Sequence, residues 1–233
     1  MFRLALACIV VIPAALGPVR HAFAADAGVY KPSSAAWPAD IDPQSGSRLP
    51  PVDREQMDEH GKRLYDALVG RTGGRSIAGL RGPGGLNLYS PRAAEHLSGL
   101  SNYLRYDSGM TGRVREVAIL TTAREMDNQF EWAAHETVAL KEGVPRETVE
   151  AIKHRASVEK LAEADAAIIQ LGREVFGARK VGSDVFARAR KLFGDRGLVE
   201  IVMLMGNYSA IAALLTTFDV QLPAGEPPLL PRR

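Results

Sequence analysis

Apolar residues recur every three or four positions along most of the chain, and no segment shows the strict alternation of a half-buried strand. Spacing of three and four residues places side chains on one face of a helix. We therefore expect an all-α fold. The expected helices span residues 53–69, 90–104, 111–125, 128–142, 145–154, 159–176, 183–193 and 198–218.

Residues that begin and end helices flank several of these segments. Asp53 and Gln56 resemble a capping pair for the first helix, and Ser90-Pro91 supplies an N-cap and a first-turn proline for the second. Gly143 is placed to end the segment 128–142, because glycine readily adopts the left-handed conformation found after helices. These signals agree with the boundaries that the apolar spacing predicts.

Glycines are concentrated between residues 79 and 89. A phosphate-binding loop is one interpretation, but the segment lacks the lysine and the spacing of a P-loop, and no strand precedes it. We expect instead an irregular loop whose backbone approaches the functional site.

The segment 198–218 is the most apolar stretch after residue 24. Its length would suffice to span a membrane. However, Glu200, Asn207 and Tyr208 interrupt it, and such side chains are costly in hydrocarbon. We therefore expect a buried core helix rather than a membrane span.

The helices expected at 111–125 and 128–142 are separated by a short break and should fold into an antiparallel hairpin. Glu131 and His135 stand four residues apart, which places their Cβ atoms about 5–6 Å apart on one helix face. Glu116 lies eleven residues before Asp127 and His135 eight residues after it, an offset of roughly 4.5 Å along the axis. The three side chains can therefore share one pocket.

The N-terminus has the pattern of a secretory signal. Arg3 precedes an apolar run over residues 4–16, and Ala22-Phe23-Ala24 forms a small-residue cleavage site. We expect residues 1–24 to be removed and the protein to be periplasmic or secreted; a retained anchor is the alternative. Residues 25–50 should form an extended arm, 51–222 a helical domain and 223–233 an extended tail.

Charge and cysteine content exclude several classes of function. The chain has 29 basic and 27 acidic residues, but Arg3 and Arg20 lie in the expected signal, so the rest is electrically balanced. We therefore expect no nucleic-acid partner and no attraction to anionic membranes. Cys8, the only cysteine, also lies in the signal. The processed protein would have no disulfide, no thiolate metal site and no cysteine nucleophile.

The hairpin resembles the carboxymuconolactone decarboxylase and alkyl hydroperoxidase D superfamily. In its peroxidase branch a glutamate is followed by eleven residues, a Cys-x-x-Cys motif, three residues and a histidine. Glu116 and His135 keep that spacing here, while Asn128 and Glu131 occupy the two cysteine positions. A thiol-dependent peroxidase mechanism cannot run without those thiols.

The decarboxylase branch of the superfamily is similar at residues 131–135, Glu-Trp-Ala-Ala-His, and at the alanine and glycine of 139–143. Less specific similarity extends over roughly residues 50–222. The resemblance implies a multi-helix bundle of the alkyl hydroperoxidase D-like type, built around the central hairpin. It also implies a homo-oligomer and a cofactor-free reaction.

The implied reaction is a decarboxylation, or a related lyase or isomerase step, on a small unsaturated carboxylate or lactone. His135 would be the general acid/base, because an imidazole exchanges protons near neutral pH. Glu131 would fix its tautomer, and Glu116 would relay a proton or raise its basicity. The residues expected to contact the substrate are Trp132, Asn128, Arg124 and Asn207.

Other interpretations of these residues exist. Glu131 and His135 could be an ordinary i,i+4 pair, with Glu116 a solvated or capping acid. A carboxylate-rich metal site is conceivable, but no second histidine or known metal motif accompanies the three residues, so we expect no metal. The alternative function is a non-catalytic or stress-associated binding protein on the same scaffold.

Overall fold

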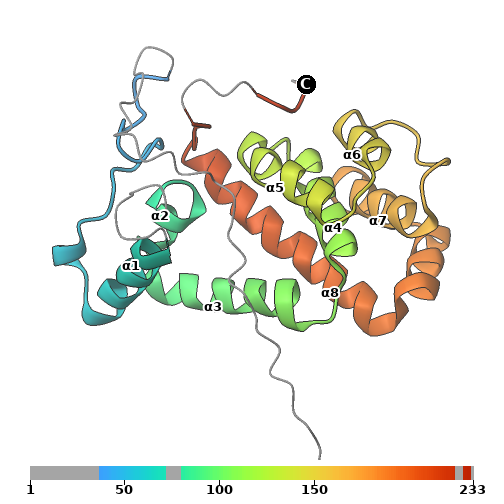
Figure 1. Ribbon diagram of the computed structural model, residues 1–233, viewed down its shortest axis with the longest axis horizontal. Coiled ribbons are helices and arrows are strands. Elements are labelled where there is room, and N and C mark those ends of the chain that lie inside the picture. The colour runs from blue at the N-terminus through green and yellow to red at the C-terminus, as the bar shows by residue number, and fades with distance from the viewer. Residues whose placement is uncertain (1–36, 72–79, 224–227, 232–233) are drawn as a thin grey trace, which may run out of the picture.

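The computed structural model describes residues 37–71, 80–223 and 228–231. Within these ranges the chain is helical and contains no β-strand, which confirms the all-α prediction (Figure 1). The expected signal, residues 1–24, and the first part of the expected arm lie outside the described residues.

The helices follow one another with short connections. Two π-helical turns, η3 and η4, continue α3 and α7. In chain order the elements are η1 (Arg54–Gln56), α1 (Glu59–Arg71), α2 (Pro83–Asn87), α3 (Pro91–Asn102), η3 (Tyr103–Asp107), α4 (Gly112–Glu125), α5 (Gln129–Lys141), α6 (Arg146–Lys153), α7 (Glu163–Arg173), η4 (Glu174–Ala178) and α8 (Ser183–Thr217).

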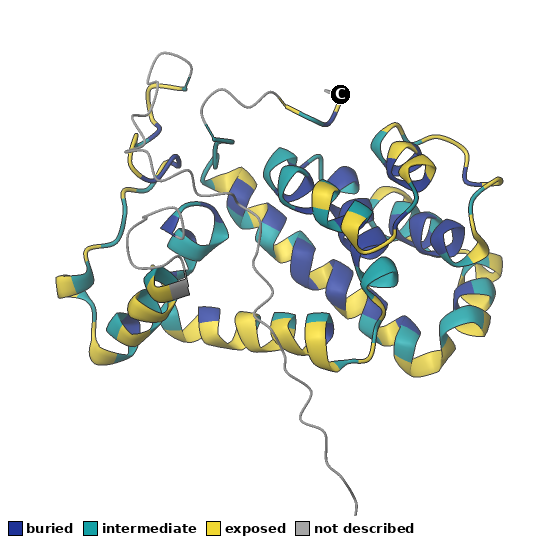
Figure 2. Cartoon of the chain, in the orientation of Figure 1, coloured by how far each residue is buried: buried dark blue, intermediate teal, exposed yellow. Residues whose placement is uncertain are grey.

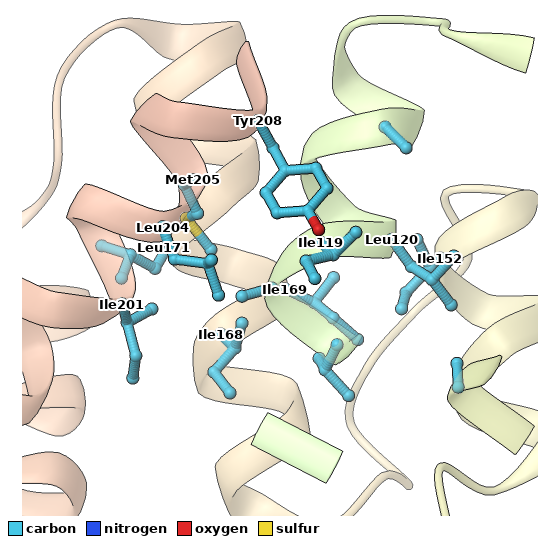
Figure 3. Packing of buried hydrophobic residues seen from close by; sticks show 14 of the residues in the cluster. Ile119, Leu120, Ile152, Ile168, Ile169, Leu171, Ile201, Leu204, Met205 and Tyr208 are labelled. Atoms are coloured by element: carbon cyan, nitrogen blue, oxygen red, sulfur yellow. The ribbon is translucent and has the colours of Figure 1, made fainter. Parts of the chain in front are cut away.

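Helix α4 forms the centre of the bundle and packs against α5, α7 and α8. All nine residues from Glu116 to Arg124 are buried, as expected for a helix surrounded by others. Figure 2 shows buried residues on α4 and α8, whereas much of α3 is exposed. In Figure 3, Ile119 of α4, Ile169 of α7 and Leu204 of α8 meet in the core.

The central hairpin has the predicted form. Thr111 caps α4 by accepting a hydrogen bond from the backbone N–H of Val114, and Asn128 caps α5 in the same way. Asp127 between them has φ 49°, a left-handed conformation that aspartate tolerates better than most residues. Gly143 after α5 has φ 84°, which confirms its role as a helix stop.

The start of the first long helix differs from the prediction. Asp53 caps the short 3₁₀ helix η1 by accepting from the N–H of Glu55, and the chain is extended at Met57. Helix α1 begins at Glu59. Asp58 accepts from the N–H of Gly61 at 2.7 Å and so provides a second cap five residues after Asp53.

The glycine-rich segment forms the short helix α2 rather than the expected irregular loop. Gly82 precedes it with φ 67°, and a Cβ at this position would lie 2.5 Å from the ring of Phe130 in α5. A Cβ at Gly85 would lie 1.8 Å from the carbonyl oxygen of Leu80. The glycines therefore allow a tight turn and close packing against α5.

Helix α8 joins the two helices expected at 183–193 and 198–218. Its backbone departs from helical geometry only at Gly194 (φ 68°, ψ 174°), within the predicted break. By length and composition α8 could cross a membrane, but half of its most apolar window is buried inside the protein. This half faces α4 and α7 and forms part of the core.

The described part of the C-terminal tail docks onto α5. Leu230 is buried in the core cluster. The side-chain amide of Gln129, at the start of α5, donates to the carbonyl of Leu230 and accepts from its N–H, both at 2.9 Å. The tail is thus fixed by both an apolar anchor and two hydrogen bonds.

Candidate active site

Neighbouring helices bring Glu116 and His135 into direct contact. Glu116 in α4 is completely buried, and His135 in α5 is 8% exposed. Oε2 of Glu116 lies 2.8 Å from Nδ1 of His135. Because a carboxylate can only accept, we assign the proton of this hydrogen bond to Nδ1. The contact orients the imidazole and leaves Nε2 facing the other side.

A second contact fixes the Glu116 carboxylate. Nε of Arg115 donates to its Oε1 at 3.2 Å, and Nη2 of Arg115 lies 3.4 Å from Glu142. Burial alone would raise the pKa of Glu116, but the hydrogen bonds and charges of His135 and Arg115 outweigh this effect and lower it. Glu116 is therefore an anion at neutral pH.

Tyr208 and Glu131 surround the opposite nitrogen of the imidazole. The hydroxyl of Tyr208 lies 3.3 Å from Nε2 of His135, and Oε2 of Glu131 lies 3.7 Å from it. The rings of His135 and Tyr208 meet edge to face, with centroids 5.2 Å apart. In Figure 3 the ring of Tyr208 extends from α8 toward Ile119 of α4, and its hydroxyl is the part nearest to that helix.

The two groups near Nε2 favour their neutral forms. Burial raises the pKa of Glu131, the charge of Glu116 raises it further, and the charges of His135 and Arg105 oppose the increase. Burial also raises the pKa of Tyr208 far above its usual range. The site therefore has an anion on one side of the imidazole and two groups able to hold a proton on the other.

Oppositely shifted carboxyl groups on one imidazole are suited to proton transfer. In enzymes, pairs of titratable groups whose environments separate their pKa values commonly take the acid and base roles. Here Glu116 fixes the orientation of the imidazole, which leaves Nε2 facing the two groups that can exchange protons with it. No group of three or more metal-binding side chains was found among the described residues.

The structure does not bring Arg124 or the amide of Asn128 to this site. Arg124 forms an ion pair with Asp127 at the hairpin turn, eight residues or about 12 Å along α4 from Glu116. The amide of Asn128 accepts from the N–H of Glu131 at 2.9 Å and donates to the carbonyl of Ala212 at 3.3 Å. Both side chains are therefore engaged in contacts within the protein, and their predicted contacts with the substrate stay predictions.

The other two predicted substrate contacts are buried. Trp132 is fully enclosed in the core, with the ammonium of Lys153 5.9 Å from its ring centroid. Asn207 is 4% exposed and immediately precedes Tyr208 on α8. Among the described atoms, neither the oxygen nor the nitrogen of its amide has a hydrogen-bond partner.

The sequence reasoning missed three residues around the site: Tyr208, Arg115 and Arg105. Arg115 precedes Glu116 directly, and this adjacency is a signal that could have found it. Tyr208 was visible only as a polar interruption of an apolar segment. Arg105 comes from the π-helical turn η3, which the apolar spacing did not distinguish from the helix before it.

Comparisons with known proteins agree with this architecture. Residues 91–171, which include the central hairpin, match the model of the carboxymuconolactone decarboxylase family. No curated protein matches the chain.

One similar solved structure is a protein of unknown function from Agrobacterium tumefaciens, described as a candidate antioxidant defence protein AhpD. The likeness covers 60% of this chain and 96% of that one, with a TM-score of 0.54 and 20% identity. At this identity the likeness concerns the fold alone. Residues 91–171 therefore match the carboxymuconolactone decarboxylase family, and the chain shares an AhpD-like fold.

Proposed function

We propose that the protein is a cofactor-free enzyme that decarboxylates, or catalyses a related lyase or isomerase step on, a small unsaturated carboxylate or lactone. His135 is its general acid/base. The observation that carries the proposal is the position of His135, with Nδ1 bound to the Glu116 anion and Nε2 beside Glu131 and Tyr208. This arrangement supports proton transfer at Nε2.

The proposed step begins with cleavage of the bond between the substrate's carboxylate and its neighbouring carbon. The electron pair of that bond moves into the unsaturated system and gives a dienolate, while carbon dioxide leaves. Nε2 of the positively charged His135 then delivers its proton to carbon. Glu116 stabilises the imidazolium before this transfer, and Glu131, whose pKa burial raises, is a nearby source for reprotonation.

Turnover of a panel of carboxylated unsaturated lactones tests this proposal. Purified protein lacking residues 1–24 is incubated with each compound, and carbon dioxide and the organic product are measured. The wild type should release both, and His135→Ala should lose at least 100-fold in rate, as general acid–base catalysis typically contributes about 10²–10⁴-fold. His154→Ala is the matched control, because the side chain of His154, which follows α6 directly, is more than half exposed.

A non-catalytic binding protein is the second candidate, and the burial of the site favours it. His135, Glu131 and Tyr208 are each at most 8% exposed in this single chain, so a substrate needs an opening to reach Nε2. A binding protein would retain small organic acids unchanged, and His135→Ala would alter affinity alone. The absence of product across the panel would favour this candidate.

We propose that this protein does not carry out thiol-dependent peroxidase chemistry, although its fold is similar to that of a candidate antioxidant defence protein. Asn128 and Glu131 stand where the peroxidase branch has its cysteines. We therefore propose no peroxidase activity, and a peroxide-consumption assay checks this directly.

We also propose that the protein is exported and forms a homo-oligomer. Exposed apolar side chains on α3, η3 and α8, among them Leu100, Tyr106, Val199 and Met203, support an interface between copies. Light scattering on the purified protein measures the mass, and fractionation of expressing cells locates it. A monomer, or retention in the cytoplasm, would contradict the respective proposal.

A further inference from the structure

The π-helical turn η3 lies between α3 and α4 and contacts α8. It is held firmly: Leu104 is completely buried, and Ser108 donates its N–H to the carbonyl of Tyr103 and its hydroxyl to that of Leu104, both at 2.9 Å. Tyr103 also donates its hydroxyl to Glu200 of α8 at 2.9 Å. Single π-helical turns of this kind occur frequently at functional sites.

Arg105, in the middle of this turn, is connected to the candidate active site through its backbone. Its carbonyl accepts a hydrogen bond from Nη1 of Arg115 at 2.8 Å, and Nε of the same Arg115 binds Glu116. Arg115 thus ties η3 to the anion that orients His135. The turn that carries Arg105 is therefore held in a fixed place beside the site.

The positive charge of Arg105 acts on both groups that lie near Nε2 of His135. Burial raises the pKa of Tyr208, and the charge of Arg105 is the strongest opposing influence on it. The same charge opposes the increase that burial causes in the pKa of Glu131. The guanidinium also lies against the ring of Tyr106, with Cζ 5.1 Å from the ring centroid.

One hydrogen-bond donor of Arg105 is unpaired. Its Nε is buried and has no hydrogen-bond partner among the described atoms. Leaving a buried donor unpaired is costly, so this N–H requires a partner such as a water molecule or a ligand. By contrast, Arg115 is engaged by Glu116 and Glu142, and Arg124 by Asp127 at the far end of α4.

Asn207 is a second buried group with unused hydrogen-bonding capacity. It follows Glu200 by seven residues on α8, so both side chains lie on the same side of this helix. Glu200 binds Tyr103 of η3, which places Asn207 on the side of α8 that is turned toward α3 and η3. Asn207 thus adds unpaired polar atoms to the side of α8 that packs against η3.

We propose that Arg105 is the residue that recognises the substrate's carboxylate, and that the natural ligand is a small organic anion rather than a neutral lactone. This inference rests on the proposed function for the identity of the site, and it specifies the substrate class. The planar guanidinium can donate two parallel hydrogen bonds to a carboxylate. It also supplies the positive charge that an anionic substrate requires beside the Glu116 anion.

Binding of sorbate, a small unsaturated carboxylate, tests the inference against its neutral ethyl ester. Affinity is measured by calorimetry on the protein lacking residues 1–24, and the Nε–H signal of Arg105 is followed by ¹H–¹⁵N NMR. Sorbate should bind and displace this signal, and ethyl sorbate should bind at least tenfold more weakly. Arg105→Gln should weaken sorbate binding at least tenfold, and Arg146→Gln, which removes an exposed charge on α6, should leave it unchanged.

Arg105→Lys keeps the charge but not the planar pair of donors, so it should bind sorbate with intermediate affinity. If Arg105→Gln does not fold, the lysine variant and the comparison of acid with ester on the wild type still decide. Sorbate that fails to bind, binds no better than its ester, or leaves the Arg105 signal in place would overturn the inference.

Turnover is recorded with the carboxylated lactones on the same preparations, which separates this inference from the proposed enzyme. Sorbate binding that depends on Arg105, with no turnover of any lactone, would refute the enzyme and keep the anion site. Turnover of a lactone together with sorbate binding that is unaltered in Arg105→Gln would keep the enzyme and refute the anion site.

Discussion

Replacing Glu116 with glutamine changes the buried group that orients His135 while keeping its size. Glu116 uses one carboxylate oxygen for Nδ1 of His135 and the other for Nε of Arg115. Glutamine offers one acceptor oxygen and one amino group, so it can keep only one of these bonds and sets a donor against the other nitrogen. Glu116→Gln therefore loses at least one hydrogen bond between charged groups.

Loss of one such bond destabilises a protein by about 1.5–3 kcal/mol. Arg115 retains its contact with Glu142, so its charge is not left without a partner, and the lower part of this range applies. We expect Glu116→Gln to reduce the free energy of unfolding at pH 7 by about 2 kcal/mol. Urea denaturation followed by circular dichroism measures this difference, with Glu159→Gln, at an exposed position, as the control.

The pH dependence of this difference gives a sharper test. The pKa of Glu116 is lower in the folded chain than in the unfolded one. Its stabilisation is therefore complete above the unfolded pKa of about 4.3 and is lost as the pH falls through the folded pKa. The gap between wild type and Glu116→Gln should narrow on acidification, because the wild-type carboxylate becomes protonated. A gap that widens, or equal stability at pH 7, would refute this reasoning.

Three further substitutions test other parts of the structure. Burial raises the pKa of Glu131, so its protonated carboxyl stabilises the fold fully below about pH 4.3, and this stabilisation is lost as the pH rises through the folded pKa. Glu131→Gln should therefore become more stable relative to wild type as the pH increases. A relative gain in stability on acidification would contradict this. Gly172→Ala places a Cβ 2.5 Å from Cγ2 of Thr121 between α7 and α4, and should cost about 1–3 kcal/mol in urea denaturation. Gly177→Ala, with open space at its Cβ, should cost less, and equal costs would refute the packing argument. Gln129→Ala removes both hydrogen bonds to Leu230 and should speed proteolytic cleavage of the tail, and an unchanged cleavage rate would show that the apolar anchor suffices.

The central hairpin was predictable because local signals determine it. Thr111 and Asn128 are strong N-caps, and the break at residues 126–128 is too short for anything but an antiparallel turn. Counting residues from Asp127 then gives the register. For this reason the spacing alone predicted that Glu116 and His135 share one pocket, whereas the hydrogen bond to Nδ1 comes from Glu116 rather than from the expected Glu131.

Helix boundaries outside the hairpin were less predictable because two competing local signals stood close together. Asp53 and Asp58 are both capable caps, and only the extended backbone at Met57 decides that α1 starts after the second. The glycines of α2 indicate a loop by composition. Their helical conformation depends on Leu80 and Phe130, which pack closely against them from outside the helix.

The surroundings of His135 were only partly predictable, because they depend on contacts between distant segments. Tyr208 lies 73 residues beyond His135 in sequence, and no local pattern indicates their contact. Arg124 is a cation on the same helix as Glu116, yet its position at the opposite end of α4 commits it to Asp127. The helix register that places Glu116 beside His135 therefore also places Arg124 about two turns away from them.

The central claim is that His135 transfers a proton to carbon. Turnover of a carboxylated unsaturated lactone in D₂O, analysed by NMR and mass spectrometry, measures this transfer directly. Wild-type protein should release carbon dioxide and place one deuterium stereospecifically on the product, whereas His135→Gln should do neither at a detectable rate. Equal deuterium incorporation by the variant, or none by the wild type with any compound of the panel, would contradict the claim.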